Sequence, residues 1–402
     1  MKFNGKRILI TQPILHSFCG STVVTIELAE YLQKCGAKVE VYSYTLDSPV
    51  VEEFRKRKIK VTTTDDNPIM KMRDYDYIWI HSQVMPESLC KQLSSLSKRK
   101  GPIFIFLHMS THDYIPDEFQ WIYSFEDKIA DKVLFISEEI EKSHLDLMEK
   151  DIPTGYFRNP APSSYIKRNK KGAKHTIGRV LIVSNHAPIE VEAAASILRS
   201  NGIIVDHLGG NGKRYSLISP KDINNYDAII TIGKTVQYCL LSKKPAYVYD
   251  IFGGPGYLGN KNYKTAKEYN FSGRGFGKKD AETIADEIIS RYNDALNFSG
   301  SLSETELRDF SLEYVLENVF NGIKKKNKDG ISKAQELSIF YAQRLAKYRF
   351  FDAYIGEKRE KRILQLEQEK RALEEREYNR TINKTKRLVK RILSKISPSN
   401  TA

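Results

Sequence analysis

The residues best suited to chemistry in this chain lie in a short unit around Gly233. Gly233, Lys234 and Thr235 follow the apolar run 228–232 and precede apolar residues at helical spacing. This pattern predicts a strand, a turn and a helix capped by Thr235. A helix N-terminus and the Lys234 ammonium would then lie at the carboxyl edge of a parallel sheet. Both attract anions, so the unit predicts a site for a diphosphate or a similar anion.

Two further interpretations of this unit stay open. A phosphate-binding loop of the pattern GxxxxGK[ST] would need a glycine at position 228, and that residue is Ala228. Hydrolysis of a nucleoside triphosphate is therefore disfavoured. The second interpretation is a structural turn with a surface lysine.

Residues that follow other predicted strands in the second half of the chain are candidates for the same ligand. Asn185 and His186 follow the strand at 180–183, and Asp250 ends the strand at 246–249. Gly253 and Gly254 follow this strand, in a loop that we expect to be irregular. The full predicted set for this ligand is Asn185, His186, Gly233, Lys234, Thr235, Gln237, Asp250, Gly253 and Gly254.

The first half of the chain supplies the candidates for proton transfer. His108 ends the apolar strand 103–107, where a group that titrates near neutral pH would have a rigid mount. His108 and Asp113 are therefore predicted catalytic residues, although a hydrogen-bonded rim histidine and a loop-capping aspartate are equal alternatives. His108 and His112 are four residues apart, but no helix or third ligand accompanies them, so no metal site is expected.

A second substrate needs contacts of its own, and four residues are predicted for it. His16 and Ser17 lie in the loop after the first predicted strand, and His81 follows the strand 76–80. Arg274 lies between two glycines, which would expose its side chain. The alternative for His81 is a packing role.

Two α/β domains are needed to position these residues. Apolar strands alternate with helical segments twice along the 402 residues, a length too great for one ordinary domain. The predicted fold is α/β, with two facing Rossmann-like domains at 1–165 and 175–323 and a helical tail at 330–402. The first domain is expected to contain strands at 7–11, 38–43, 76–80, 103–107 and 132–136.

The composition indicates a globular protein that stays on the cytosolic side of the membrane. Hydrophobic residues make up 41% of the chain, and no apolar run is long enough for a signal peptide or a membrane span. Four widely spaced cysteines form no metal or disulfide pattern, which is typical of a reducing cytosol. The net charge of +14 predicts anionic partners.

The last predicted helix separates aliphatic from basic side chains. Such a helix favours contact with an anionic membrane surface, and Lys386, Arg387, Lys390 and Arg391 are predicted to make that contact. Nucleic acid is a weaker candidate, because the aliphatic face has no aromatic residues for base stacking. The helix could also be solvated, or it could self-associate as a coiled coil, which Leu366 and Leu373, one heptad apart, support.

Three predicted strands form a series of motifs: Tyr77-Ile-Trp-Ile-His81, Ile103-Phe-Ile-Phe-Leu-His108 and Ala130-Asp-Lys-Val-Leu-Phe-Ile-Ser137. In their order and spacing these motifs resemble those of GT-B glycosyltransferases, and of glycosyltransferase family four in particular. The resemblance covers about residues 5–300 and leaves the tail without a counterpart. It implies a nucleotide-sugar donor bound by the second domain and a glycan or lipid-linked acceptor on the first. It also implies that His108 lies near the donor sugar. No metal or other cofactor is expected if the helix N-terminus and Lys234 neutralise the leaving diphosphate.

The chain departs from that family at one position. The family's helix before the equivalent of Pro245 carries a glutamate that binds the nucleotide ribose, and here Tyr238, or Gln237 with a slip of one residue, takes its place. The family's preceding glutamate, near the donor sugar, is also missing. The resemblance predicts transfer of a sugar to a growing bacterial surface glycan. The alternative is a non-catalytic module of this fold whose tail scaffolds other proteins.

Overall fold

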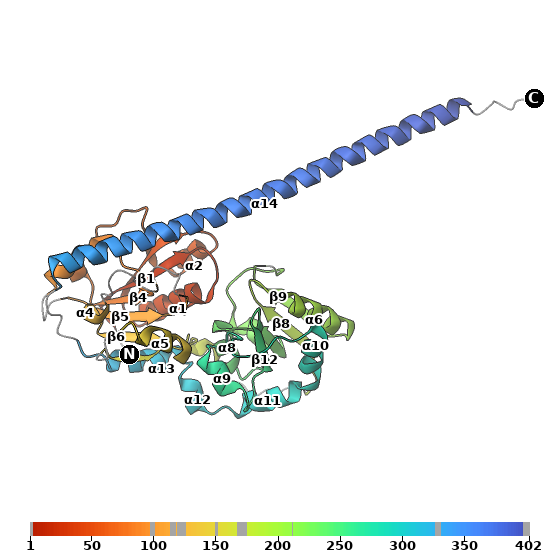
Figure 1. Cartoon of the computed structure of the whole chain (residues 1–402). Coiled ribbons are helices and arrows are strands. Elements are labelled where there is room, and N and C mark those ends of the chain that lie inside the picture. Colours follow the sequence, from red (N-terminus) through yellow and green to blue (C-terminus); the bar gives the residue numbers. More distant parts are fainter. Residues whose placement is uncertain are drawn as a thin grey trace, which may run out of the picture. The chain divides into compact units, whose positions relative to one another are not determined.

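Alternating buried strands build two sheets in the computed structural model (Figure 1). The structure describes residues 3–96, 101–112, 118, 126–148, 152–166, 175–210, 212–325 and 331–396, without the side chains of 357, 361, 381 and 389–396. Residues up to Arg344 form one unit by their contacts, and the chain from Leu345 forms a second unit. The two units are described separately below.

The first sheet has seven parallel strands in the order β3-β2-β1-β4-β5-β6-β7. The strand order reverses between β1 and β4, which makes this pair the switch point where open α/β sheets bind ligands. The strands are β1 (Arg7–Leu15), β2 (Lys38–Leu46), β3 (Lys60–Thr63), β4 (Tyr77–His81), β5 (Ile103–His108), β6 (Lys132–Phe135) and β7 (Thr154–Tyr156).

The second sheet has five strands in the order β12-β11-β10-β8-β9, and its switch point lies between β8 and β10. All pairs are parallel except β11 with β12. The strands are β8 (Arg179–Val183), β9 (Ile204–Leu208), β10 (Ala228–Thr231), β11 (Ala246–Asp250) and β12 (Gly253–Tyr257). The predicted fold class is confirmed, and each sheet lies within one predicted domain. The predicted domain boundaries stay predictions.

Helices cover both faces of the second sheet, as the continuous apolar strands require. Successive residues of β10 alternate between two core clusters: Ile229 packs with α8 on one face, and Ile230 packs with α6 and α10 on the other. The helices of the two domains are α1 (Gly20–Lys34), α2 (Val50–Arg57), α3 (Glu87–Cys90), α4 (Glu126–Ile129), α5 (Glu138–Leu145), α6 (Ile189–Ser200), α7 (Pro220–Asn224), α8 (Lys234–Leu241), α9 (Tyr263–Glu268), α10 (Ala281–Ser290), α11 (Tyr292–Ser301) and α12 (Glu304–Arg308).

The chain returns to the first domain through α13 (Leu312–Asn321). The ring of Phe320 lies 4.7 Å from that of Phe3 and 5.2 Å from that of Tyr77, and it also contacts Trp79. Backbone hydrogen bonds join Ala161 to the start of this helix. The first domain is therefore completed by a segment that follows the second.

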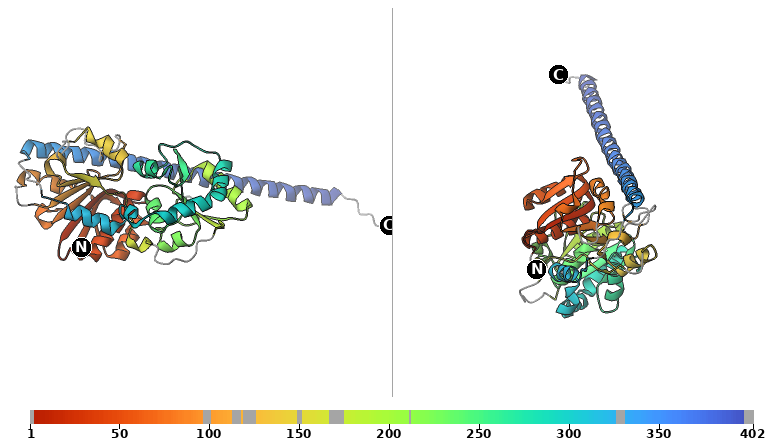
Figure 2. Two further views of the ribbon diagram at one scale, coloured as in Figure 1. Left: turned by 90° about the horizontal axis from the view of Figure 1, so that it is seen from below. Right: turned by 90° about the vertical axis from the view of Figure 1, so that its left-hand side faces the viewer.

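The tail forms a single helix, α14 (Lys333–Ile396), which is continuous in both views of Figure 2. Its first turns belong to the domain unit rather than to a free tail, because Glu336 and Gln343 are buried there. Glu336 accepts a hydrogen bond of 2.7 Å from the backbone N–H of Ser94, and the Gln343 amide bonds to the backbone of Gln83 and Met85. Only the chain from Leu345 onward is a separate unit.

Candidate active site

The loops at the two switch points contact each other. The side-chain amide of Asn185, just after β8, donates a hydrogen bond of 3.1 Å to the carbonyl of Phe18, between β1 and α1. The backbone N–H of Phe18 donates to the hydroxyl of Tyr215 at 2.7 Å, and their rings lie 5.2 Å apart. The carboxyl edges of both sheets therefore face one another, with the predicted ligand residues distributed along them.

Helix α8 ties the two domains together, and Lys234 is at the centre of this contact. Its ammonium lies 2.6 Å from Glu27 of α1 and donates to the carbonyls of Asn159 and Pro160. The Lys234 side chain is only 5% exposed. Burial lowers the pKa of Lys234, and the Glu27 carboxylate opposes that shift. The predicted contact with an anionic ligand would require this ammonium to leave its present partners.

Tyr238 of α8 also contacts Glu27 of α1. Its hydroxyl donates to Glu27 at 2.6 Å, and its ring stacks 4.0 Å from that of Tyr165. Burial and the Glu27 charge raise the pKa of Tyr238 well above its usual value. Tyr238, one of the two positions that the resemblance aligns with the family's ribose-binding glutamate, is thus buried, and the carboxylate beside it comes from the first domain. Sequence reasoning missed Glu27 because nothing in α1 marks it out.

The start of α8 depends on Gly233. Its φ of 52° and ψ of −128° fit glycine and almost no other residue, and this glycine, not Thr235, precedes the first helical residue. The sequence predicts a single buried face for α8, but all eight of its residues are buried, because the sheet and the first domain both cover the helix. The side chain of Gln237 is fully buried, and among the described residues its amide makes no hydrogen bond.

Three predicted residues from separate segments are close enough for their charges to interact: His186 follows β8, Asp250 ends β11, and Arg274 follows α9. Burial raises the pKa of Asp250, and the nearby charges of His186 and Arg274 oppose that shift. Arg274 forms a two-pronged ion pair with Glu139 of α5, at 2.6 and 2.7 Å, so it bridges to the first domain. His186 is exposed and Asp250 is half-buried. Arg274 therefore connects this edge of the second sheet with the first domain.

The segment from Gly253 is a strand, so the expectation of an irregular loop was wrong. Because glycine lacks a side chain, β12 can pack tightly against neighbouring backbone: a Cβ on Gly253 would lie 2.3 Å from the carbonyl of Gly277. A Cβ on Gly254 would lie 2.1 Å from the carbonyl of Val248. Both glycines are buried, and the structure explains them by this packing. Their predicted ligand contact stays a prediction.

The predicted second-substrate residues of the first domain lie at its switch point. His16 and Ser17 directly follow β1 and are half-buried. His81 ends β4 and is fully buried, bonded through Nδ1 to the Gln12 amide oxygen at 2.8 Å and to the Thr25 hydroxyl at 3.1 Å. Burial lowers the pKa of His81 to about 3, so its ring is neutral. This environment favours the packing role for His81.

His108 is enclosed by acidic residues. Its Nε2 lies 2.8 Å from Glu126, its Nδ1 lies 3.4 Å from Glu118, and the ring of His144 lies 4.1 Å away. Burial alone would lower the pKa of His108, but the two carboxylates outweigh it and raise the value to about 10. Burial and the His108 charge lower the pKa of His144 to about 4. Catalysis by His108 stays a prediction, and Asp113 lies outside the described residues.

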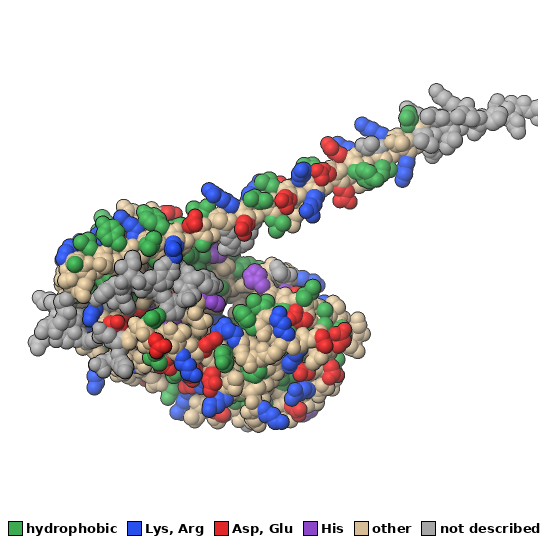
Figure 3. All heavy atoms as spheres, viewed as in Figure 1, with side chains coloured by type: hydrophobic (Ala, Val, Ile, Leu, Met, Phe, Trp, Pro, Cys, Tyr) green, Lys and Arg blue, Asp and Glu red, His purple; other side chains and the backbone are tan. Residues whose placement is uncertain are grey.

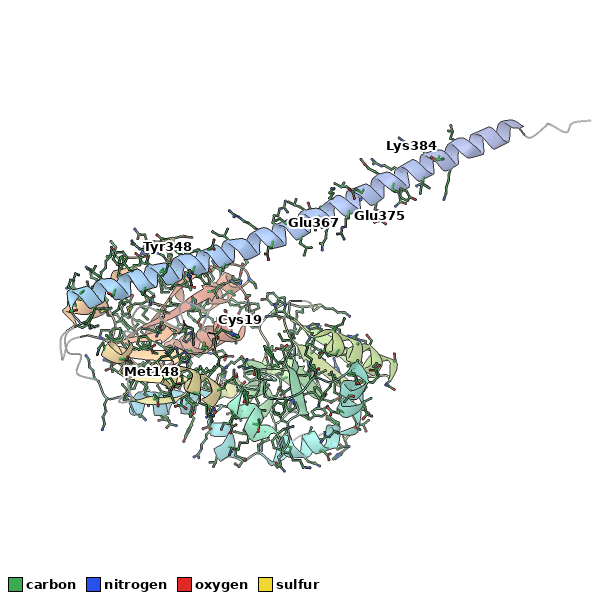
Figure 4. All side chains as sticks on the ribbon, viewed as in Figure 1. Cys19, Met148, Tyr348, Glu367, Glu375 and Lys384 are labelled. Carbon is green, nitrogen blue, oxygen red and sulfur yellow. The ribbon has the colours of Figure 1, made fainter. Side chains whose placement is uncertain are left out.

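The predicted membrane residues belong to the second unit. Lys386 and Arg387 are exposed, and the side chains of Lys390 and Arg391 lie outside those described. Along the described part of this helix, basic, acidic and hydrophobic side chains are interspersed (Figure 3), and Glu367, Glu375 and Lys384 project from it (Figure 4). The exposed hydrophobic residues include Leu366, Leu373 and Leu388.

Known structures resemble this chain in fold. A glycosyltransferase from Rickettsia africae superimposes with a TM-score of 0.51 at 15% identity, over 79% of this chain and 97% of its own. HepE from Anabaena, crystallised with UDP, superimposes with a TM-score of 0.53 at 10% identity, over 79% of this chain and 98% of its own. No protein-family model and no curated protein sequence matches the chain. The chain therefore has the two-domain GT-B fold, and the resemblance to family four stays a prediction.

Proposed function

We propose that this protein is a glycosyltransferase that moves a sugar from a nucleotide-sugar donor to an acceptor. The observation that carries the proposal is the contact between the two switch points, through Asn185, Phe18 and Tyr215. Open α/β sheets bind ligands at these points. Two such points that face each other can hold two substrates side by side, which is what a transfer reaction needs. That HepE was crystallised with UDP on a similar fold supports a nucleotide donor.

In this proposal the second domain binds the donor diphosphate without a metal ion. The N-terminus of α8 provides partial positive charge, and Arg274 and His186 lie at the same edge of the sheet. The nitrogen and oxygen of the buried Gln237 amide would form hydrogen bonds with the ribose. The acceptor lies on the first domain beside His16 and Ser17, and we propose a lipid-linked glycan for it.

A panel of nucleotides and nucleotide sugars in a thermal-shift assay tests the proposal. A ligand at 100 times its Kd stabilises the folded protein by about 2.7 kcal/mol, which such an assay detects. We expect one nucleotide and its sugar conjugates to raise the melting temperature, and incubation of that conjugate with acceptor to release the nucleoside diphosphate.

A matched pair of histidine variants locates the ligand. His186→Ala should weaken the binding of the nucleotide sugar, because it removes a polar group beside Asp250, whereas the exposed His175→Ala should not. If no nucleotide or nucleotide sugar shifts the melting temperature, the enzyme proposal fails.

The tail is proposed to hold the enzyme at an anionic membrane surface on the cytosolic side. No helix in the part of the chain that the structure describes is long and apolar enough to cross a membrane. The basic end of α14 would therefore lie on the surface, where each lysine or arginine contributes on the order of 1 kcal/mol. Lys386 and Arg387 are exposed as this contact requires.

Reversal of four charges at the end of the tail should release the protein from anionic vesicles. We expect Lys386→Glu, Arg387→Glu, Lys390→Glu and Arg391→Glu together to weaken co-sedimentation at least about tenfold, and added salt to weaken that of the unmodified protein. The matched control reverses Arg362, Lys370, Arg371 and Arg376, which lie upstream among acidic residues. Equal loss in both variants, or no binding to anionic vesicles at low salt, would refute a specific role for the end of α14.

One observation favours the scaffold alternative. Lys234 forms an ion pair with Glu27 across the domain boundary, and Tyr238 donates a hydrogen bond to it. Neither Tyr238 nor Gln237, the positions aligned with the ribose-binding glutamate of family four, is a carboxylate. A module that lost its donor could retain this fold and use α14 as an interaction surface. Release of the nucleoside diphosphate from a nucleotide sugar, by hydrolysis or transfer, decides between the two, because a non-catalytic module could still bind the nucleotide.

A further inference from the structure

We propose that His108, Glu118 and His144 form a binding site for a divalent cation, and that the cation is zinc. Two imidazole nitrogens and a carboxylate oxygen are a ligand set that zinc uses in proteins. The three residues come from different segments: His108 ends β5, His144 lies in α5, and Glu118 lies between β5 and α4. All three are buried.

Two of the separations between ligand atoms are close to those around a tetrahedral ion. The Glu118 carboxylate lies 3.4 Å from Nδ1 of His108 and 3.7 Å from Nε2 of His144, and all three atoms lie within 4.8 Å of one another. Bonds of about 2.0–2.2 Å to a tetrahedral zinc ion place neighbouring ligand atoms roughly 3.3–3.6 Å apart. The same Glu118 oxygen accepts hydrogen bonds from the backbone N–H groups of Met109 and Ser110, at 2.8 and 3.1 Å. Zinc would therefore displace these bonds or bind the second oxygen of the carboxylate, with a water molecule as the fourth ligand.

In each imidazole, the nitrogen that would not bind the metal has a hydrogen-bond partner, as is usual for histidine ligands of metals. The other nitrogen of His108 lies 2.8 Å from the Glu126 carboxylate, and the other nitrogen of His144 lies 2.9 Å from the carbonyl of Ile140. Such acceptors fix the tautomer so that the unprotonated nitrogen faces the metal. Glu126 is in turn held by the amide of Gln83.

The charge of the cluster matches a divalent ion. Glu118 and Glu126 bring two carboxylates into a buried site, where charge without a partner is costly. A divalent cation balances both carboxylates once His108, which is protonated without the ion, releases its proton. The site would then tie Glu118 to β5 and α5, next to the carboxyl edge of the first sheet. A zinc-bound His108 would have no nitrogen left for proton transfer, so this inference replaces the predicted catalytic role of His108. It leaves the proposed donor site on the second domain unchanged.

Zinc titration of the full-length protein tests the site. After dialysis against a chelator, the protein should bind one zinc ion per chain in competition with a chromophoric chelator, and zinc should raise its melting temperature. Glu118→Gln and His144→Gln should weaken the affinity by at least about 100-fold, and Glu126→Gln by about 10–100-fold, as the loss of a supporting carboxylate does. His175→Gln, an exposed histidine, should bind zinc like the unmodified protein.

Circular dichroism of the metal-free variants shows whether each one folds. If the ligand variants do not fold, X-ray absorption at the zinc edge of the unmodified protein decides, since it should show two imidazoles around the ion. The proposal is overturned if the unmodified protein binds no zinc tightly, if the folded ligand variants bind it as well as His175→Gln does, or if the spectrum lacks imidazole.

Discussion

Replacement of Lys234 by methionine should lower the free energy of unfolding by about 3–5 kcal/mol. The substitution removes one partner of a buried ion pair and leaves the Glu27 carboxylate without its counterion, and such losses cost about that much. The methionine fills a similar volume, so the loss reflects charge rather than a cavity. Urea unfolding followed by tryptophan fluorescence and by circular dichroism measures the change.

A second substitution and a surface pair control this experiment. Adding Glu27→Gln should restore most of the stability, because the amide still accepts from the hydroxyl of Tyr238 and no buried charge remains. Lys267→Met breaks an ion pair with the half-exposed Asp309 and should cost no more than about 1 kcal/mol. If Lys234→Met is no more harmful than Lys267→Met, the domain contact of α8 is not buried in solution.

The second large effect concerns Gly233, whose replacement by alanine should impair both stability and donor binding. A Cβ at its φ of 52° and ψ of −128° strains the backbone by about 1–3 kcal/mol, even though no neighbouring atom blocks it. The strain would move the first turn of α8, where the diphosphate is proposed to bind. We expect the donor affinity to fall at least about tenfold, as measured by calorimetry with the nucleotide that the panel identifies.

Gly300→Ala is the matched control for this change. Gly300 lies in α11, is exposed and has no atom near its virtual Cβ, so alanine should be neutral or stabilise the helix by up to about 1 kcal/mol. If Gly233→Ala binds the donor like Gly300→Ala does, the N-terminus of α8 is not part of the donor site.

The strands of the fold were predictable because most are short apolar runs that end in polar residues. The expected strands appear within a few residues of their predicted bounds, whereas β3, β7 and β12 were missed. β12 is a run of glycines and one proline, which intrinsic preference assigns to a loop. It forms because glycines allow three backbone segments to pack closely.

The candidate site was less predictable, since its contacts join distant segments. Glu27 lies on an ordinary amphipathic helix and becomes notable only because α8 packs against it. Likewise, the spacing of His108 and His112 gave no third ligand, while the structure groups His108 with Glu118 and His144. Strand ends identify which edge of a sheet can bind a ligand, but the contacts that support those residues depend on tertiary packing.

The return of α13 to the first domain has a consequence for synthesis on the ribosome. Trp79 is made early, but Phe320, which covers it, follows about 240 residues later. At ordinary rates of translation this delay is on the order of 10–50 s. During that time the nascent first domain exposes Phe3, Tyr77 and Trp79, so the growing chain offers chaperones an aromatic surface that the finished protein hides.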